Sequence, residues 1–530
     1  MNQTAKPTKK RLSLSSAATL LVGSALFGQI LGFLRTRLVN ANFKATGAHS
    51  TDAYFAAFNI PDFFFFTLAA GALGVAFMPV LAERLHKGDR RGMWELSTSL
   101  LNLLMLVMGG VALVILIFAE PLVHYVVAPN MSSEQLHTTV TIMRFLALNP
   151  LLFTISGVLT AVQQTFGRFF FYALAPLLYN LAIILSIFVF RHNIGLVGLG
   201  IGALVGAVLQ LGVVAFGLIG TGFHWSPKIL WRSSDFRLIL RQLPPRSLDQ
   251  GIDATEAIIE THFARRLGAG NISYYNNAYT LSTAPQLLIG TAISTAAFPQ
   301  LNNRLAQGRP DLFRKEFLKI LRVMIWISMP VVVICFFTRG YLARLIYANN
   351  APQIALIFGF LTLGIFFTIL YTLISRWFYA HKDTKTPLFV SIFTIIFNII
   401  LVSFLARPST YNVSGLAIAQ SIVAMVEVII LTTIMLIRDP RLFNLDFWMG
   451  IVRIVSVTGF SVVAGFIMVT LLPLGANDKG IVTLGSKLVL IAGVTLAVHL
   501  GVSALFELEE TRPVFRRLKR ILLKPIHMLY

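Results

Sequence analysis

A row of carboxylates within one apolar stretch is the feature of this sequence best suited to chemistry. Along residues 241–267, one arginine and four acids are spaced three or four residues apart: Arg246, Asp249, Asp253, Glu256 and Glu260. In an α-helix this spacing places all five side chains within about 80° of one face. Such a face could bind a cation or a proton and balance the charge of a substrate. The alternative is a ladder of buried ion pairs to Arg246, Arg265 and Arg266.

The usual signatures of catalysis are absent from the sequence. There is no His-Glu-x-x-His motif, no phosphate loop with Gly-Lys-Ser/Thr and no nucleophile elbow. The ten histidines are scattered, and no two are spaced to share a helical face as metal ligands. We therefore expect a protein that is not an enzyme and has no cofactor, with Na⁺ or H⁺ as the candidate coupling ion.

The elements that must position these residues are membrane helices. Hydrophobic residues make up 56% of the chain and charged residues 12%, which excludes an ordinary soluble enzyme. An ionisable group in a membrane span costs several kcal/mol unless it faces a cavity or a partner, so each one is a functional candidate. Apolar runs of helical period and bilayer-spanning length occur about 14 times, at 15–41, 52–83, 94–127, 136–165, 170–190, 195–220, 241–267, 273–303, 316–347, 352–380, 387–406, 412–437, 447–473 and 482–507.

The basic residues gather on alternate loops. The formal net charge is +22, with a basic cluster before the first span and no basic residue at 128–135. This positive-inside pattern predicts a multi-pass membrane protein with both termini cytoplasmic, and the placement of the charges argues against nucleic-acid binding. The basic amphipathic segment 510–530 is expected to lie on the anionic inner leaflet.

The chain contains an internal repeat. Residues 76–79 (Ala-Phe-Met-Pro) recur at 296–299 (Ala-Ala-Phe-Pro), an offset of 220 residues, and further anchors downstream show similar offsets. Many membrane carriers build an alternating-access cavity between two such copies. We expect an all-α fold with two pseudo-symmetric six-helix bundles, two extra membrane helices and a tail, at 1–220, 221–440, 441–509 and 510–530.

Polar side chains in the first two spans extend the candidate site. Gln29 and Arg35 lie about 9 Å apart along the axis of the first predicted helix, and the second span opens with Asp52. Arg37, near the end of the first span, is expected to extend to lipid headgroups.

Two backbone features concern packing. Pro61 is expected to kink the second span next to four phenylalanines at 63–66, which either line a lipid path or face the bilayer. Glycines spaced by four at Gly198, Gly202 and Gly206 predict close contact between two helices.

Several motifs resemble those of the MurJ/MviN family. They are residues 30–35 (Ile-Leu-Gly-Phe-Leu-Arg), 51–61 (Thr-Asp-Ala-Tyr-Phe-Ala-Ala-Phe-Asn-Ile-Pro), 76–79, 175–180 (Ala-Pro-Leu-Leu-Tyr-Asn) and 378–387 (Phe-Tyr-Ala-His-Lys-Asp-Thr-Lys-Thr-Pro). Members are lipid II flippases of the multidrug/oligosaccharidyl-lipid/polysaccharide exporter superfamily. The resemblance implies two bundles around a cationic cavity that accepts the undecaprenyl-pyrophosphate-linked peptidoglycan precursor.

The resemblance also assigns individual residues. Arg35 and Asp52 are similar to a cavity arginine and aspartate of the family. Glu260 and Asn398 are similar to residues that help hold a sodium ion in some members. At three positions where members carry functional arginines, this chain has other residues: Gln29, Phe65 and Thr280. Arg246 could replace them, because its planar fork matches phosphate oxygens.

The sequence therefore predicts a flippase that carries lipid II outward by alternating access for cell-wall synthesis. Arg35 and Arg246 are expected to hold the pyrophosphate, and Gln29, Asp52, Asp249, Asp253 and Glu256 are expected to belong to the substrate site. Asp249, Asp253, Glu256 and Glu260 are also expected to couple transport to a cation or to the membrane potential. Two alternatives stay open: a cation-coupled exporter of another lipid-linked glycan or of amphipathic cations, and a non-transporting scaffold. The expected partners are the glycan lipid, membrane lipids and other cell-wall synthesis proteins.

Overall fold

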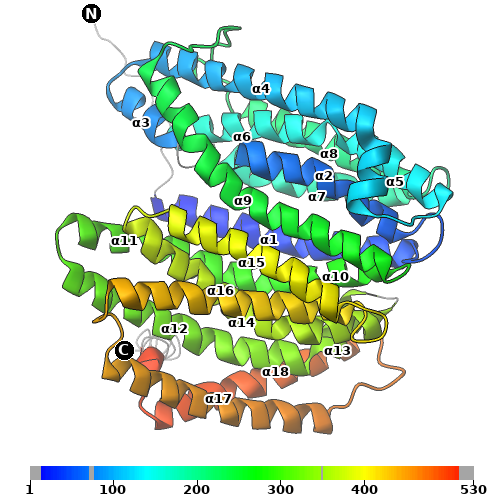
Figure 1. Cartoon of the computed structure of the whole chain (residues 1–530), viewed down its shortest axis with the longest axis vertical. Helices are drawn as coiled ribbons and strands as arrows, with labels where there is room; N and C mark the ends of the chain where they lie inside the picture. Colours follow the sequence, from blue (N-terminus) through cyan, green and yellow to red (C-terminus); the bar gives the residue numbers. More distant parts are fainter. Residues whose placement is uncertain (1–13, 71–76, 348–349, 513–530) are drawn as a thin grey trace, which may run out of the picture. The chain divides into compact units, whose positions relative to one another are not determined.

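A computed structural model describes residues 14–70, 77–347 and 350–512 of the chain, and its regular structure in these ranges is helical throughout (Figure 1). The predicted all-α class is therefore confirmed. Most of the predicted basic tail, from residue 513 on, lies outside the described residues. By their internal contacts the residues form two compact units, Met1–Ile272 and Ser273–Tyr530. The bundle ranges predicted above follow the sequence repeat and stay a prediction.

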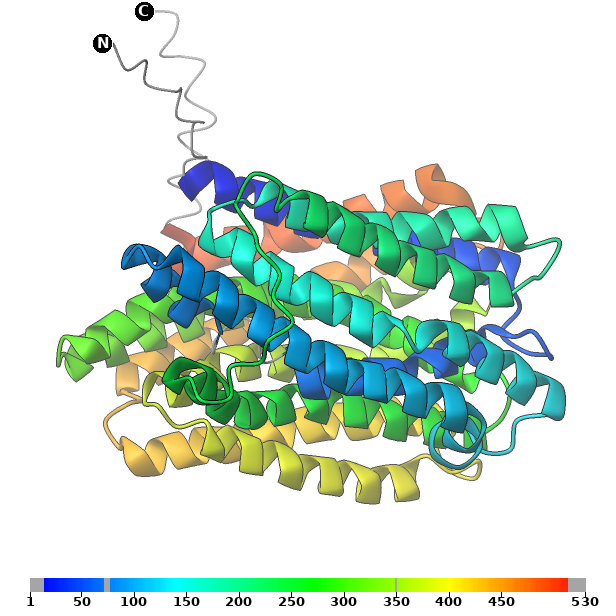
Figure 2. The same cartoon turned by 90° about the horizontal axis from the view of Figure 1, so that it is seen from above.

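The first unit consists of long helices joined by short turns. Within it α4, α6 and α8 run alongside one another (Figure 2). A buried apolar cluster that includes Leu96 of α4 and Val162 of α6 also takes in Phe236 near the start of α9. Its elements are α1 (Leu14–Asn42), α2 (Thr51–Phe65), η1 (Phe66–Ala70), α3 (Met78–His86), α4 (Arg90–Pro121), η3 (Leu122–Val127), α5 (Ser133–Leu146), α6 (Asn149–Thr165), α7 (Phe170–Phe190), α8 (Val197–Phe216) and α9 (Ser234–Arg266).

The second unit begins within α10 and ends with two helices that the repeat does not contain. Buried polar bonds join α18 to α12 and to α17: the Trp326 indole of α12 donates to Ser503 of α18 at 2.9 Å, and His499 of α18 contacts Ser461 of α17 at 2.9 Å. Its elements are α10 (Asn271–Pro285), η4 (Gln286–Thr291), α11 (Ala292–Ala306), α12 (Pro310–Phe337), α13 (Arg339–Ile346), α14 (Ala351–Ala380), α15 (Lys385–Leu405), α16 (Ser414–Arg438), α17 (Leu445–Leu471), α18 (Gly480–Leu505) and η5 (Glu509–Thr511).

The helices are those of a multi-pass membrane protein. Four of the predicted spans correspond to α1, to α2 with η1, to α9, and to α10 with η4 and α11, and the first three of these carry most of the polar residues of the predicted site. In the described part of the chain, ten others are long and apolar enough to cross a bilayer: Arg90–Val127, Ser133–Thr165, Phe170–Phe190, Val197–Phe216, Pro310–Phe337, Ala351–Ala380, Lys385–Leu405, Ser414–Arg438, Leu445–Leu471 and Gly480–Leu505.

The sequence repeat has a counterpart in local structure. The π-helix η1 starts at Phe66 and the π-helix η4 starts at Gln286, the same offset of 220 residues as between the two proline motifs. Each π-helix precedes a short α-helix, α3 or α11, that contains the motif proline, Pro79 or Pro299. Because π-turns are rare and often occur at functional sites, their recurrence supports a duplicated functional unit.

The glycine row forms a close helix seam, as predicted. A Cβ atom at Gly198 would lie 2.2 Å from Phe190, and one at Gly202 would lie 2.2 Å from the Ser186 hydroxyl. At Gly206 it would lie 2.9 Å from the Tyr179 ring. The absence of side chains therefore lets α8 approach α7 along three successive turns.

Candidate functional site

A buried polar network joins the start of α2 to the end of α9 within the first unit. Asp52, in the first turn of α2, is fully buried, and its carboxylate accepts a hydrogen bond from the backbone N–H of Gly270 at 2.6 Å. The guanidinium of Arg265 lies 4.0 Å from the same carboxylate. A buried carboxylate needs such donors, because burying an unpaired charge is costly.

Arg265 also connects this pair to α5. Its side chain is 8% exposed and donates to the carbonyl of Asn130 and to the side-chain oxygen of Gln135, both at 2.9 Å. The amide of Gln135 in turn donates to the Gly47 carbonyl at 2.7 Å and to the Ser50 hydroxyl at 3.0 Å. One guanidinium thus fixes the end of α9 against two other helices and the loop before α2.

The carboxylates predicted on α9 follow a gradient of burial. Asp253 is exposed, Glu256 is half-buried and Glu260 is 6% exposed. Next to Glu260, the Thr261 hydroxyl donates to the side-chain oxygen of Asn59 on α2 at 3.3 Å. These carboxylates share one side of α9, and the buried end of the row is the end closest to the Asp52 network. Arg246 belongs to the same helix.

The side chains of Arg246 and Asp249 lie outside the described residues, although their backbone is part of α9. One turn further on, Gly251 is buried, and a Cβ atom there would lie 2.5 Å from the hydroxyl of Thr67. The glycine therefore lets α9 approach η1 closely. This contact holds the part of α9 that carries the predicted charged residues against the π-helix η1.

A second polar cluster surrounds Arg35. Its charge acts on Tyr54 and Asp62 of α2 and on Tyr179 of α7. Tyr54 is 3% exposed, and its hydroxyl has no hydrogen-bond partner among the described residues. Gln29, six residues before Arg35 on α1, is half-buried. A guanidinium, a carboxylate and phenol groups can together bind a phosphate and control its release.

Asp62 was not among the predicted site residues. The sequence did contain a signal for it, a carboxylate directly after Pro61 in an apolar span. An ionisable residue inside a membrane span is a functional candidate. Tyr54 and Asp62 are eight residues apart, within about 80° of each other around a helix. The pair can be recognised as a site only when the fold shows that both residues of α2 lie near Arg35 of α1.

Comparison with known proteins identifies the family. A family model described as "Lipid II flippase MurJ" matches residues 44–476. The chain belongs to the MurJ lipid II flippase family. It is thus a polytopic membrane transporter rather than an enzyme, as predicted.

Individual MurJ relatives are distant. The chain is 24% identical over 429 residues to the probable lipid II flippase MurJ of Borreliella burgdorferi, covering 80% of this chain and 83% of the relative. It is 24% identical over 529 residues to that of Rhizobium tropici, covering 96% and 97%. A solved structure described as "Lipid II flippase MurJ, inward closed conformation" matches with a TM-score of 0.74 at 21% identity, over 92% of this chain and 98% of that one. The last comparison confirms the fold.

At two of the positions where the resemblance to MurJ predicts arginine, this chain has an uncharged residue. The ring of Phe65 packs on Phe153 at a centroid distance of 5.7 Å, and Phe153 packs on Tyr179 at 5.2 Å. Thr280 donates its hydroxyl to the Asn276 carbonyl of its own helix at 2.8 Å. An aromatic cluster therefore occupies the Phe65 position, next to the Arg35 cluster.

The predicted sodium ligands come from different units. Glu260 is buried on α9 of the first unit, and Asn398 is 1% exposed on α15 of the second. Within the described residues, no group of three or more His, Cys, Asp or Glu side chains could hold a metal ion. A sodium site at Glu260 and Asn398 stays a prediction.

Proposed function

We propose that this protein moves lipid II from the inner to the outer leaflet of the bacterial cytoplasmic membrane by alternating access, with both termini in the cytoplasm. The observation that carries the proposal is the family match over residues 44–476. The duplicated π-helices η1 and η4 support it, because inverted or repeated halves are the usual basis of alternating access.

In this proposal Arg35 and Arg246, with Gln29, bind the pyrophosphate. Charge-assisted hydrogen bonds from a guanidinium to phosphate are strong in an environment of low dielectric constant. Tyr54 has a free hydroxyl in the described structure, and it adds a neutral donor beside Arg35.

The carboxylates Asp249, Asp253, Glu256 and Glu260 are proposed to couple the return step to a cation, to a proton or to the membrane potential. Moving one charge across the membrane is worth about 2.3 kcal/mol per 100 mV, so a few such groups suffice to drive a cycle. Asp52 is proposed to contact substrate only in a conformation in which Gly270 and Arg265 have separated from it, since both hold it here.

An apolar groove in the second unit suits the lipid tail. It has a volume of about 450 Å³ and is lined by side chains of α12, α14, α16 and α17, among them Phe336, Phe360 and Val462. Phe336 is 43% exposed, and the lining is almost entirely apolar. An isoprenoid chain can be accommodated there by burial of apolar surface alone.

The test is complementation of a strain depleted of its own lipid II flippase. The parent chain should restore growth, and Arg35→Ala and Arg246→Ala should not. Arg91→Ala is the control, because Arg91 is 91% exposed at the start of α4 and bonds only Glu95 in the described structure. Growth of the depleted strain with every variant would contradict the proposed phosphate ligands. Failure of the parent chain to restore growth would contradict lipid II as the substrate.

Export of amphipathic cations is the second candidate function. The uncharged residues Phe65 and Thr280 and the acidic row of α9 favour it, because a cationic substrate would be repelled by the arginines that this chain lacks. Dye efflux that depends on Glu256, without restored growth of the depleted strain, would favour this function over lipid II transport.

A further inference from the structure

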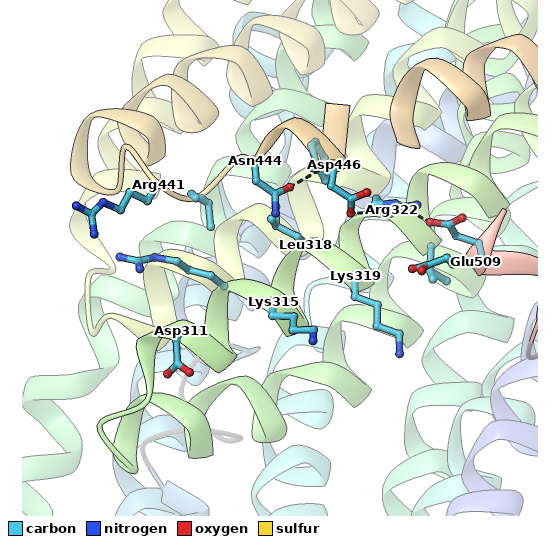
Figure 3. Close-up of a pocket in the computed structure, with 14 residues that line it drawn as sticks. Asp311, Lys315, Leu318, Lys319, Arg322, Arg441, Asn444, Asp446 and Glu509 are labelled. Carbon is cyan, nitrogen blue, oxygen red and sulfur yellow. Dashed lines mark hydrogen bonds and ion pairs between the residues drawn. The ribbon is translucent and has the colours of Figure 1, made fainter. Parts of the chain in front are cut away.

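A groove with charges of both signs lies in the second unit, where α12 and α17 begin and η5 ends the described chain (Figure 3). Its volume is about 430 Å³. Neither the transport proposal nor the repeat accounts for it. Five cationic side chains and four carboxylates are among its lining residues: Arg314, Lys315, Lys319, Arg322 and Arg441, and Asp311, Asp446, Glu509 and Glu510.

Three of the cations are available to a ligand. Lys315, Lys319 and Arg441 are exposed and form no ion pair with the described residues. Lys315 and Lys319 are four residues apart and extend from the same side of α12 (Figure 3). A phosphate group placed over them would receive charge-assisted hydrogen bonds from two or three side chains.

The other two cations already form ion pairs within the protein. Arg314 contacts Asp439 at 2.6 Å, and Arg322 contacts the Glu510 carboxylate at 2.7 Å. Arg322 also reaches Asp446 at 3.4 Å. These pairs connect α12 to the segment after α16, to α17 and to η5, and we call Lys315 and Lys319 the basic part of the groove and Glu509 and Glu510 its acidic part.

The acidic part contains an unsatisfied buried atom. Glu510 is 7% exposed, and only one of its carboxylate oxygens contacts Arg322, while Oε2 has no hydrogen-bond partner among the described residues. Glu509 lines the groove next to it and is exposed. Buried carboxylate oxygens normally have a donor, so a missing donor here indicates a ligand that brings one. A primary ammonium group supplies three.

The groove lies at the depth of the lipid headgroups. Both α12 and α17 are candidate membrane spans, and the groove begins at their first turns and follows α12 as far as Val323. Leu445 is 74% exposed and Trp448 is 52% exposed in the first turn of α17. Exposed tryptophan at a span end is typical of the boundary between headgroups and acyl chains. A ligand in the groove would therefore be within reach of the membrane surface.

We propose that this groove binds the headgroup of a zwitterionic phosphoethanolamine lipid. The phosphate lies on Lys315 and Lys319, and the ammonium donates to Glu509 and to the Glu510 carboxylate. A purely anionic headgroup would leave the carboxylates unsatisfied and repelled, and a choline headgroup has no N–H to donate. The bound lipid would join α12, α17 and η5. This inference does not depend on which lipid is transported.

Binding can be measured on the purified full-length protein by native mass spectrometry. The ligands are phosphatidylethanolamine, phosphatidylcholine and phosphatidylglycerol with identical acyl chains, and soluble glycerophosphoethanolamine. Phosphatidylethanolamine is expected to bind about tenfold more tightly than phosphatidylcholine, the effect of one or two charge-assisted hydrogen bonds. Glycerophosphoethanolamine should bind much more weakly than the lipid, and equal binding would overturn the assignment to a membrane lipid.

Variants separate the two parts of the groove. Lys315→Gln and Lys319→Gln, both at exposed positions that folding tolerates, should weaken phosphatidylethanolamine binding severalfold. Glu510→Gln should abolish the preference over phosphatidylcholine without weakening phosphatidylglycerol. Lys385→Gln, an exposed lysine at the start of α15, is the matched control and should change nothing. Equal affinities for the two zwitterionic lipids, tighter binding of phosphatidylglycerol, an unchanged affinity for phosphatidylethanolamine in Lys319→Gln, or an unchanged preference for it in Glu510→Gln would each overturn the proposal.

Discussion

The carboxylate of Asp52 and the guanidinium of Arg265 face each other at 4.0 Å inside the first unit, with the Gly270 N–H as a second donor at 2.6 Å. The two side chains come from the start of α2 and the end of α9. Arg265 makes two further hydrogen bonds, to Asn130 and Gln135. An interaction of this kind can hold one conformation of a transporter, because its charges are satisfied only when these helix ends meet.

Asp52→Asn is expected to destabilise this conformation. The amide oxygen can still accept from Gly270, but Arg265 loses the anion that balances its buried charge. Breaking a buried pair from one side typically costs about 3–5 kcal/mol. Thermal unfolding of the purified protein in detergent should show a clearly lower midpoint.

Asp89→Asn is the control for this change. Asp89 pairs with Arg84 at 3.2 Å, but its side chain is 50% exposed. An exposed ion pair contributes about 1 kcal/mol or less, so the midpoint should change little. If both variants unfold at the same temperature as the parent, the Asp52–Arg265 pair does not stabilise the fold.

Gly202→Ala is expected to separate α7 from α8. The new Cβ atom would lie 2.2 Å from the Ser186 hydroxyl and 2.4 Å from its Cβ, so the backbone must move. Overpacking of this kind costs about 1–3 kcal/mol. Gly212→Ala on the same helix is the matched control, because nothing lies within 4 Å of its Cβ position. That variant should be neutral or slightly more stable, by up to about 1 kcal/mol. Equal unfolding midpoints for the two variants would contradict the close contact between α7 and α8 at Gly202.

The glycine seam and the helix succession could be predicted because both depend on local sequence. Spacing by four at Gly198, Gly202 and Gly206 determines a helix face without reference to distant residues. The partners of Asp52 could not be predicted in the same way. One is a backbone N–H at Gly270, which has no sequence signature. The other, Arg265, was considered only in the alternative of an ion-pair ladder along its own helix.

Asp62 shows a second limit of sequence analysis. A carboxylate between Pro61 and a run of phenylalanines looks like an isolated polar residue in the sequence, and only the fold puts it within the field of Arg35. Conversely, the row on α9 was visible at once because its members share one helix face. Periodicity detects sites built along one element, whereas sites assembled from several elements need the fold.

Acid should weaken the connection between α14, α15 and α16 through Asp383. Partial burial alone would raise the pKa of Asp383, but hydrogen bonds from the hydroxyl and backbone N–H of Thr386 and from Arg438 lower it to about 2, below the ordinary value of 3.8. Because the folded pKa is depressed, the interaction stabilises the protein above about pH 4 and is lost as the pH falls toward 2. The contribution is about 1 kcal/mol after allowing for solvent screening, since Arg438 is partly exposed.

Asp383→Asn should therefore lower the unfolding midpoint at neutral pH. Its difference from the parent protein should shrink as the pH is reduced below 4, because the parent then loses the same interaction. Glu507→Gln, at an exposed residue after α18, is the control and should show no such convergence. A constant difference between Asp383→Asn and the parent from pH 7 to pH 3 would mean that the carboxylate charge is not what stabilises this loop.

Asp62→Asn should strengthen substrate binding and slow transport if Arg35 binds the pyrophosphate. The Asp62 carboxylate competes with the substrate for the positive field of Arg35, and its removal leaves the guanidinium more attractive to phosphate. Removal of one full unit charge from a partly solvated site changes binding by about 1.4 kcal/mol, or tenfold, which is the upper limit here. Binding of a pyrophosphate-linked lipid should tighten by up to that factor, while growth of the flippase-depleted strain becomes slower because release is slower. The double variant Arg35→Gln/Asp62→Asn should lose the gain in affinity. Tighter binding in both variants would show that Asp62 acts independently of Arg35.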